Sequence, residues 1–98
     1  MTHETVYSQI THERVSKFAH EHRFPGWYID SNGCYGCVIG RFWISIFVND
    51  CDDTLDITVD TIGEEGFFDQ NLEWETPEDD NALAETARRF MAKYAAKR

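Results

Sequence analysis

Carboxylates are the side chains best placed to do chemistry in this sequence of 98 residues, and most of them occur in its middle. Between residues 42 and 87 there are 14 of the 18 Asp and Glu residues and no Lys or Arg. This segment carries −14, whereas the flanking segments, with nine basic and four acidic residues, carry +5. Segregated charge creates a strong local field. It argues against direct binding to nucleic acid or to an anionic membrane, because both need clustered Lys and Arg.

Two acidic segments show the alternation of half-buried strands. In residues 55–59 and 67–75 apolar and polar side chains alternate, and the turn signal 63–66 lies between them. A hairpin about this turn places Ile57 opposite Leu72. Both apolar sets then lie on one side, which supports this register. The sets are Leu55, Ile57 and Val59 in the first strand and Phe68, Leu72 and Trp74 in the second.

The same register predicts a ladder of acids on the second side of the hairpin. Asp56 lies opposite Glu73, and Asp60 lies opposite Asp69. Like charges directly opposite destabilise a sheet by about 0.2–1 kcal/mol per pair. The ladder is either a solvated outer face that discourages edge-to-edge aggregation or a docking face that steers Lys and Arg groups of a partner. Two aromatic residues of segment 42–48 would serve as anchors beside it, or would pack under a helix. The candidate partner-binding residues are Asp56, Asp60, Asp69, Glu73, Glu75, Glu64 and Glu65, with Trp43 and Phe47.

Cysteine is the second residue type that could carry chemistry. Cys34 and Cys37 have C-x-x-C spacing, but a redox motif needs a helix N-terminus, and these residues fall on a predicted strand. A structural zinc site needs four ligands, which Cys51 and a histidine would have to complete. Free thiols are the simpler interpretation, so we expect neither a metal nor a cofactor. A zinc-binding or regulatory domain that uses Cys34, Cys37 and Cys51 is kept as an alternative.

The sequence contains no motif that predicts an enzyme. There is no Ser/His/Asp arrangement, no phosphate-binding glycine loop and no metallopeptidase motif. Residues 50–56 have the composition of a calcium loop, but the 12-residue pattern with its central Gly and terminal Glu is missing. We therefore expect no catalytic residues.

The elements that position the carboxylates are predicted from periodicity. Apolar residues at helical spacing occupy the first twenty or so positions, and Pro25 and Gly26 end that helix. Strands are expected at 27–30, 34–39 and 42–48, in addition to the two alternating segments above. Segment 42–48 is apolar on both faces, which is typical of a central strand.

The C-terminal segment is predicted to be an amphipathic helix. Thr76 is the expected N-cap, Pro77 the first helical residue, and Asp79 completes a capping box. The apolar face comprises Leu83, Ala87, Phe90, Met91 and Tyr94. Together these elements predict one compact acidic α+β domain over residues 1–98. Its four- to five-stranded antiparallel sheet is flanked by an N-terminal and a C-terminal helix, both packed on one face.

These features favour a small protein that acts by binding another macromolecule. The N-terminus lacks a basic segment followed by an apolar one, so we expect a cytoplasmic protein. The expected partner is a basic protein or nucleoprotein complex. One such function is that of an inhibitor that blocks a nucleic-acid-handling complex, as a phage counter-defence (anti-CRISPR) protein does. A homodimeric adaptor or chaperone, with the two-sided apolar strand as its interface, is a further hypothesis.

Overall fold

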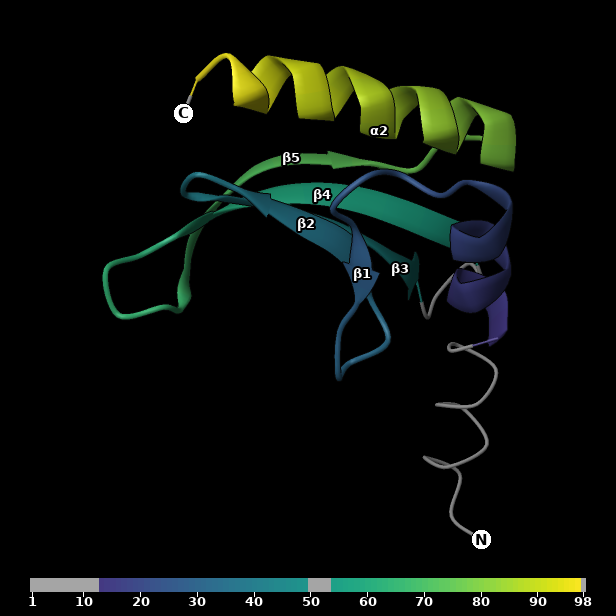
Figure 1. Cartoon of the computed structure of the whole chain (residues 1–98), viewed down its shortest axis with the longest axis horizontal. Coiled ribbons are helices and arrows are strands. Elements are labelled where there is room, and N and C mark those ends of the chain that lie inside the picture. Colours follow the sequence, from purple (N-terminus) through teal and green to yellow (C-terminus); the bar gives the residue numbers. More distant parts are fainter. Residues whose placement is uncertain (1–12, 50–53, 98) are drawn as a thin grey trace, which may run out of the picture.

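The computed structural model describes residues 13–49 and 54–97, which form a five-stranded antiparallel sheet with one helix before it and one after it (Figure 1). The strands are β1 (Tyr28–Ile29), β2 (Tyr35–Ile39), β3 (Phe42–Asn49), β4 (Thr54–Ile62) and β5 (Phe68–Glu75). Their order in the sheet is their order in the sequence, and all neighbouring strands are antiparallel. Residues 13–21 belong to the first helix, α1, and α2 spans Asp80–Ala95. The predicted α+β class is confirmed.

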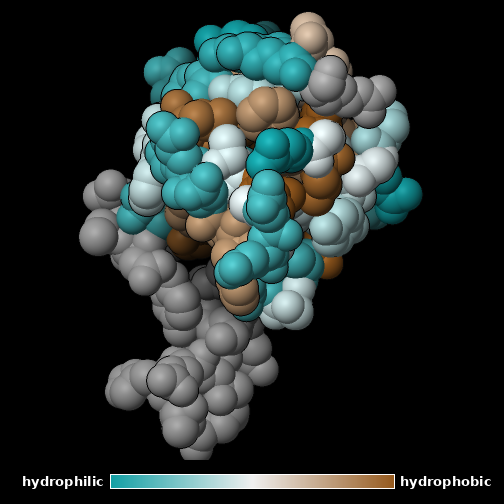
Figure 2. Space-filling model, turned by 90° about the vertical axis from the view of Figure 1, so that its left-hand side faces the viewer, coloured by the Kyte–Doolittle hydropathy of each residue, from teal (hydrophilic) through white to brown (hydrophobic). Residues whose placement is uncertain are grey.

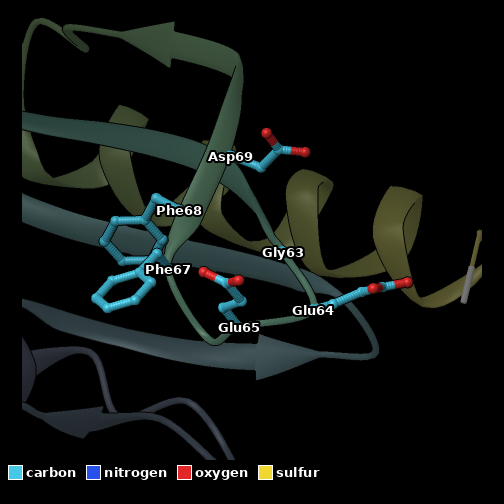
Figure 3. Close-up of a pocket in the computed structure, with 6 residues that line it drawn as sticks. All are labelled: Gly63, Glu64, Glu65, Phe67, Phe68 and Asp69. Carbon is cyan, nitrogen blue, oxygen red and sulfur yellow. The ribbon is translucent and has the colours of Figure 1, made fainter.

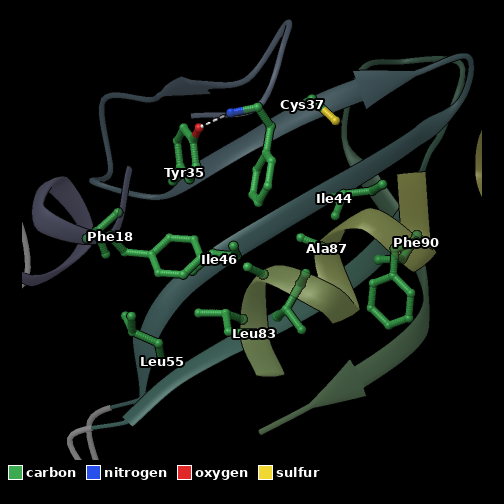
Figure 4. Packing of buried hydrophobic residues seen from close by; sticks show 14 of the residues in the cluster. Phe18, Tyr35, Cys37, Ile44, Ile46, Leu55, Leu83, Ala87 and Phe90 are labelled. Carbon is green, nitrogen blue, oxygen red and sulfur yellow. Dashed lines mark hydrogen bonds between the residues drawn. The ribbon is translucent and has the colours of Figure 1, made fainter. Parts of the chain in front are cut away.

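A single core lies between one face of the sheet and the helices. α2 runs along this face (Figure 1), and Figure 4 shows its side chains against those of β2, β3 and β4. From α2, the buried residues Leu83, Ala87, Phe90 and Tyr94 confirm the predicted apolar face, and Met91 is half-buried. Val15 and Phe18 of α1 belong to the same cluster. The sheet contributes Tyr35, Cys37, Ile44, Ile46, Val48, Leu55, Ile57 and Val59.

An aromatic corner holds the end of α1 against β2. Phe18 packs on Tyr35 with ring centroids 6.3 Å apart, and Phe24 stacks on the same ring at 6.1 Å. The Tyr35 hydroxyl accepts a hydrogen bond from the Phe24 N–H at 3.0 Å and donates one to the His22 carbonyl at 3.1 Å. These contacts satisfy backbone groups freed where α1 ends.

The prediction for the start of α2 was wrong by one turn. Asp79 is the N-cap, and its carboxylate accepts a hydrogen bond from the Ala82 N–H at 2.8 Å. Thr76 and Pro77 lie in the preceding loop. The Thr76 hydroxyl instead bonds to Asp56 on β4, and a tertiary contact therefore replaces the predicted cap.

The register of β4 against β5 also differs from the prediction. Ile57 lies opposite Glu75, not opposite Leu72, and Val59 lies opposite Glu73. In this part of the ladder the offset is an odd number of residues, which exchanges the faces of Glu73, Trp74 and Glu75. Two register shifts occur in the half of the hairpin nearer its loop. An extra residue at each shift interrupts the alternation of side chains between the two faces of the strand, and the predicted pairing assumed that this alternation is continuous.

Gly36 provides a test of how closely β2 and β3 pack. A Cβ at this position would lie 2.1 Å from the carbonyl oxygen of Ile44, which no side chain can occupy without moving a strand. We expect Gly36→Ala to lower the free energy of unfolding by about 1–3 kcal/mol in urea denaturation. At Gly63 the nearest atom is 3.4 Å from the added Cβ, so Gly63→Ala is the matched control and should change stability by less than about 1 kcal/mol. Equal effects of the two substitutions would contradict this account.

Candidate functional site

One face of the sheet is covered by helices and the other, which we call the open face, is not covered by any helix in the described part of the chain (Figure 1). Alternation along each strand and the observed register place side chains from four strands on the open face. They are Val38 of β2, Trp43, Ser45 and Phe47 of β3, Asp56, Thr58 and Asp60 of β4, and Trp74 of β5.

Aromatic rings line the open face. Trp43 is only 7% exposed and lies between the rings of Tyr28 and Phe68, with centroid distances of 5.8 and 6.5 Å. The two flanking rings are 51% and 64% exposed. Phe47 packs edge-on against Trp74 at 5.8 Å, and Trp74 is 58% exposed. The predicted anchors Trp43 and Phe47 therefore form the floor of this face, and the rings beside them reach solvent.

The large apolar side chains that are exposed all belong to the sheet and its β4–β5 loop, and none in the described residues belongs to a helix. The space-filling view of the molecule shows apolar surface emerging between hydrophilic groups (Figure 2). Exposed apolar surface of this kind is typical of interaction sites. The residues are Tyr28, Val38, Phe67, Phe68, Leu72 and Trp74.

Asp56, a predicted docking residue, is fully buried beneath this face and has a structural role. Its carboxylate accepts hydrogen bonds from the Trp74 indole N–H at 2.7 Å, the Asn49 amide at 2.9 Å and the Thr54 hydroxyl at 3.3 Å. Burial acts to raise the pKa of Asp56, but hydrogen bonds from Trp74, Asn49, Thr76 and Thr54 outweigh burial and lower it. Asp56 thus links three strands and fixes the orientation of Trp74.

Asp60 faces an amide and not the predicted carboxylate. Asn71 of β5 lies opposite it and donates a hydrogen bond to its carboxylate at 2.9 Å. The same amide donates to the carbonyls of Val59 and Glu73 at 3.4 and 3.1 Å. Asp60 is therefore not paired with Asp69 as predicted. Asn71 lies at the register shift, and its side chain satisfies backbone carbonyls there.

Glu73 and Glu75 lie on the helix side of the sheet, where α2 neutralises them. Arg89 binds Glu75 at 2.9 Å, and Lys93 binds Glu73 at 3.0 Å. The Tyr94 hydroxyl also donates a hydrogen bond to Glu73. Burial acts to raise the pKa of Glu73, but Tyr94 and Lys93 outweigh it and lower the pKa, while burial and Glu73 raise the pKa of Tyr94. These two acids contribute to the packing of α2 and not to the open face.

The remaining predicted acids, Glu64, Glu65 and Asp69, surround a shallow pocket of about 310 Å³ at the β4–β5 loop. Phe67 and Phe68 complete its lining with Gly63. Figure 3 shows both phenyl rings on one side, with the carboxylate of Glu65 directed toward that side and those of Glu64 and Asp69 directed away. The ion pairs of the described residues include none of these three acids.

The predicted set is thus divided by the structure. Asp60 lies on the open face and Glu65 is directed toward the exposed rings, whereas Glu64 and Asp69 are directed away from those rings. Glu73 and Glu75 face α2, and Asp56 is enclosed. The alternating pattern predicts Phe68 and Trp74 on the core face of β5, and it therefore does not indicate these exposed rings as binding residues. The adjacent pair Phe67-Phe68 directly after a Gly-rich acidic turn is the sequence signal that could have indicated them.

The cysteines within the described residues are free thiols. Burial raises the pKa of Cys37 to about 11, and burial together with Asp30 raises the pKa of Cys34 despite a hydrogen bond with Ser45. Both thiols are therefore protonated at neutral pH, which makes them poor nucleophiles and poor metal ligands. Residues 13–49 and 54–97 contain no group of three or more His, Cys, Asp or Glu placed to hold a metal ion. Cys51 and its neighbours lie outside the described residues, so zinc binding through Cys51 stays a prediction.

Comparison of the chain with protein-family models, with curated proteins and with solved structures found no match. Within the described residues, no helix has the length and apolar character needed to cross a membrane. The function is accordingly inferred from the geometry and charge of this chain alone.

Asp56 generates a stability prediction. We expect Asp56→Asn to lower the free energy of unfolding by about 1–3 kcal/mol at neutral pH. One carboxylate oxygen of Asp56 accepts hydrogen bonds from both the Trp74 indole and the Asn49 amide, and an NH₂ group in its place would accept neither. Glu85→Gln, at an exposed position of α2, is the control and should stay within about 0.5 kcal/mol of the wild type.

The pH dependence of this difference follows from the direction of the pKa shift. The folded-state pKa of Asp56 lies below its ordinary value of 3.8. The stabilisation is therefore present above that value and is lost as the pH falls through the folded-state pKa. Urea unfolding should show the difference between wild type and Asp56→Asn shrinking on acidification. A difference that stays constant from neutral pH to about pH 3 would show that the carboxylate charge is not what stabilises this site.

Proposed function

We propose that this chain is a protein-binding domain that docks on a basic partner through the open face of its sheet. The observation that carries the proposal is the position of the exposed rings. Tyr28 and Phe68 flank the buried Trp43, Trp74 packs on Phe47, and each of the three flanking side chains is more than half exposed. Aromatic anchors around a desolvated centre are the usual composition of binding hot spots.

The distribution of ion pairs supports a basic partner. Both ion pairs of the described residues join β5 to α2, on the helix side of the sheet. We call Asp60, Glu64, Glu65 and Asp69 the acidic rim; none of them takes part in an ion pair with the described residues. Uncompensated charge beside an apolar patch accelerates association with a partner of opposite charge and disfavours other partners.

Inhibition of a nucleic-acid-handling complex is the particular form of this function that the charge supports. A groove that binds nucleic acid is lined by Lys and Arg, and the segment between residues 42 and 87 carries −14. A domain that docks there would compete with nucleic acid for the same basic residues. A phage counter-defence protein of the anti-CRISPR type would act in this way.

Substitutions on the two sides of the sheet test the proposal. In a pull-down from a lysate of the encoding organism, we expect basic proteins to be captured at low salt and released as salt rises. Tyr28→Ala combined with Phe68→Ala should remove this capture, because it deletes exposed rings while leaving the core intact. Glu65→Lys should weaken it, whereas Glu85→Lys, the same charge change on α2, should not. Capture that is indifferent to the open-face variants but lost in Glu85→Lys would overturn the proposal.

Self-association is the competing use of an exposed apolar face. Each copy has a net charge of −9, so pairing two open faces would bring their acidic rims together without a counter-charge. We expect light scattering to give the mass of a monomer, 11.4 kDa, at low salt. A dimer that dissociates in Phe68→Glu would instead assign the open face to a second copy.

A further inference from the structure

The pocket at the β4–β5 loop places aromatic rings and a carboxylate side by side. Phe67 is 73% exposed and Phe68 is nearly as open, so their ring faces are available to a partner. The carboxylate of Glu65 extends toward the side on which these rings lie (Figure 3). Because Phe68 also stacks on Trp43, the pocket is continuous with the open face.

A planar cation satisfies both groups at once. The guanidinium of Arg stacks on an aromatic ring while its N–H groups bind a carboxylate, whereas the Lys ammonium is compact and strongly hydrated. A ring beside a carboxylate therefore favours Arg over Lys. The pocket volume of about 310 Å³ leaves room for one such side chain.

The chain contains an internal example of this arrangement. Arg89 of α2 lies with its guanidinium carbon 5.4 Å from the centroid of Phe90, and the same group binds both carboxylate oxygens of Glu75 at 2.9 and 3.1 Å. The loop pocket presents the ring and the carboxylate without an Arg. Arg41 lies beside the start of this loop, since its carbonyl accepts a hydrogen bond from the Ile62 N–H, but the ion pairs of the described residues do not include it.

We propose that the β4–β5 loop pocket receives an arginine side chain of the partner protein, stacked on Phe67 and Phe68 and paired with Glu65. This inference rests on the proposed function and specifies the chemistry of the partner: an arginine on the basic surface, flanked by apolar groups that meet Trp43 and Trp74. A lysine-rich surface of equal charge would bind the acidic rim but would not occupy the pocket in this way.

The experiment uses the full chain, labelled with ¹⁵N, and two defined probes. The probes are acetylated and amidated peptides of equal length and charge, one with arginines and the other with lysines at the same positions. We expect the arginine peptide to bind about fivefold more tightly, with the largest amide shifts at Glu65, Phe67 and Phe68. Equal affinities with shifts confined to the open face would overturn the arginine inference and leave the proposed function standing. Shifts on α2, or none with either peptide, would overturn both.

Variants separate the pocket from the general charge of the rim. Phe67→Ala removes an exposed ring and should abolish the preference for arginine while leaving the affinity for the lysine peptide unchanged. Glu65→Gln should reduce arginine binding more than lysine binding. Glu64→Gln removes the same charge from a side chain directed away from the rings and should weaken both peptides equally. A preference for arginine that survives both Phe67→Ala and Glu65→Gln would overturn the pocket assignment.

Discussion

The pairing of β4 with β5 is the constraint on which the rest of the structure depends. Its odd offset from a simple alternating hairpin turns Glu73 and Glu75 toward α2 and turns Trp74 toward the open face. The glutamates then hold the helix through Lys93 and Arg89, and the indole reaches the buried carboxylate of Asp56 on the other side. One register therefore determines both how the helix is attached and which rings a partner meets.

This division gives the two faces different electrostatic character. Glu73 and Glu75, which face α2, are neutralised by Lys93 and Arg89, whereas the acids of the acidic rim take part in no ion pair with the described residues. Because the carboxylates that face α2 are ion-paired, a domain with a net charge of −9 can pack an apolar core under the helix and still present the acidic rim at its surface. Repulsion on the open face is limited because Asp60 meets Asn71 and because Asp56 is surrounded by neutral donors. Such donors stabilise a buried carboxylate without a cation.

Local periodicity was sufficient to predict most of the fold, and long-range pairing was not. The helical stripe of Leu83, Ala87 and Phe90 and the alternation of Leu55, Ile57 and Val59 each indicate one element and one buried face, and both faces are buried as predicted. The register depends on shifts near Asp60 that no periodicity encodes, and the helix cap moved because Thr76 bonds to Asp56. For the candidate site, the predicted pairing assigned the acids Glu73 and Glu75 of β5 to the wrong face and its exposed rings to the core.

Quenching of tryptophan fluorescence tests the central claim that exposed rings and uncompensated carboxylates share the open face. Trp74 is the exposed indole there, whereas Trp43 is buried. The difference in quenching between the wild type and Trp74→Phe therefore reports the charge around Trp74. At an ionic strength of about 0.15 M, where charges beyond about 8 Å are largely screened, caesium and iodide sample charge close to this indole. The account predicts that caesium quenches Trp74 more strongly than iodide does, once each is referenced to free tryptophan amide. Equal quenching, or a preference for iodide, would contradict it.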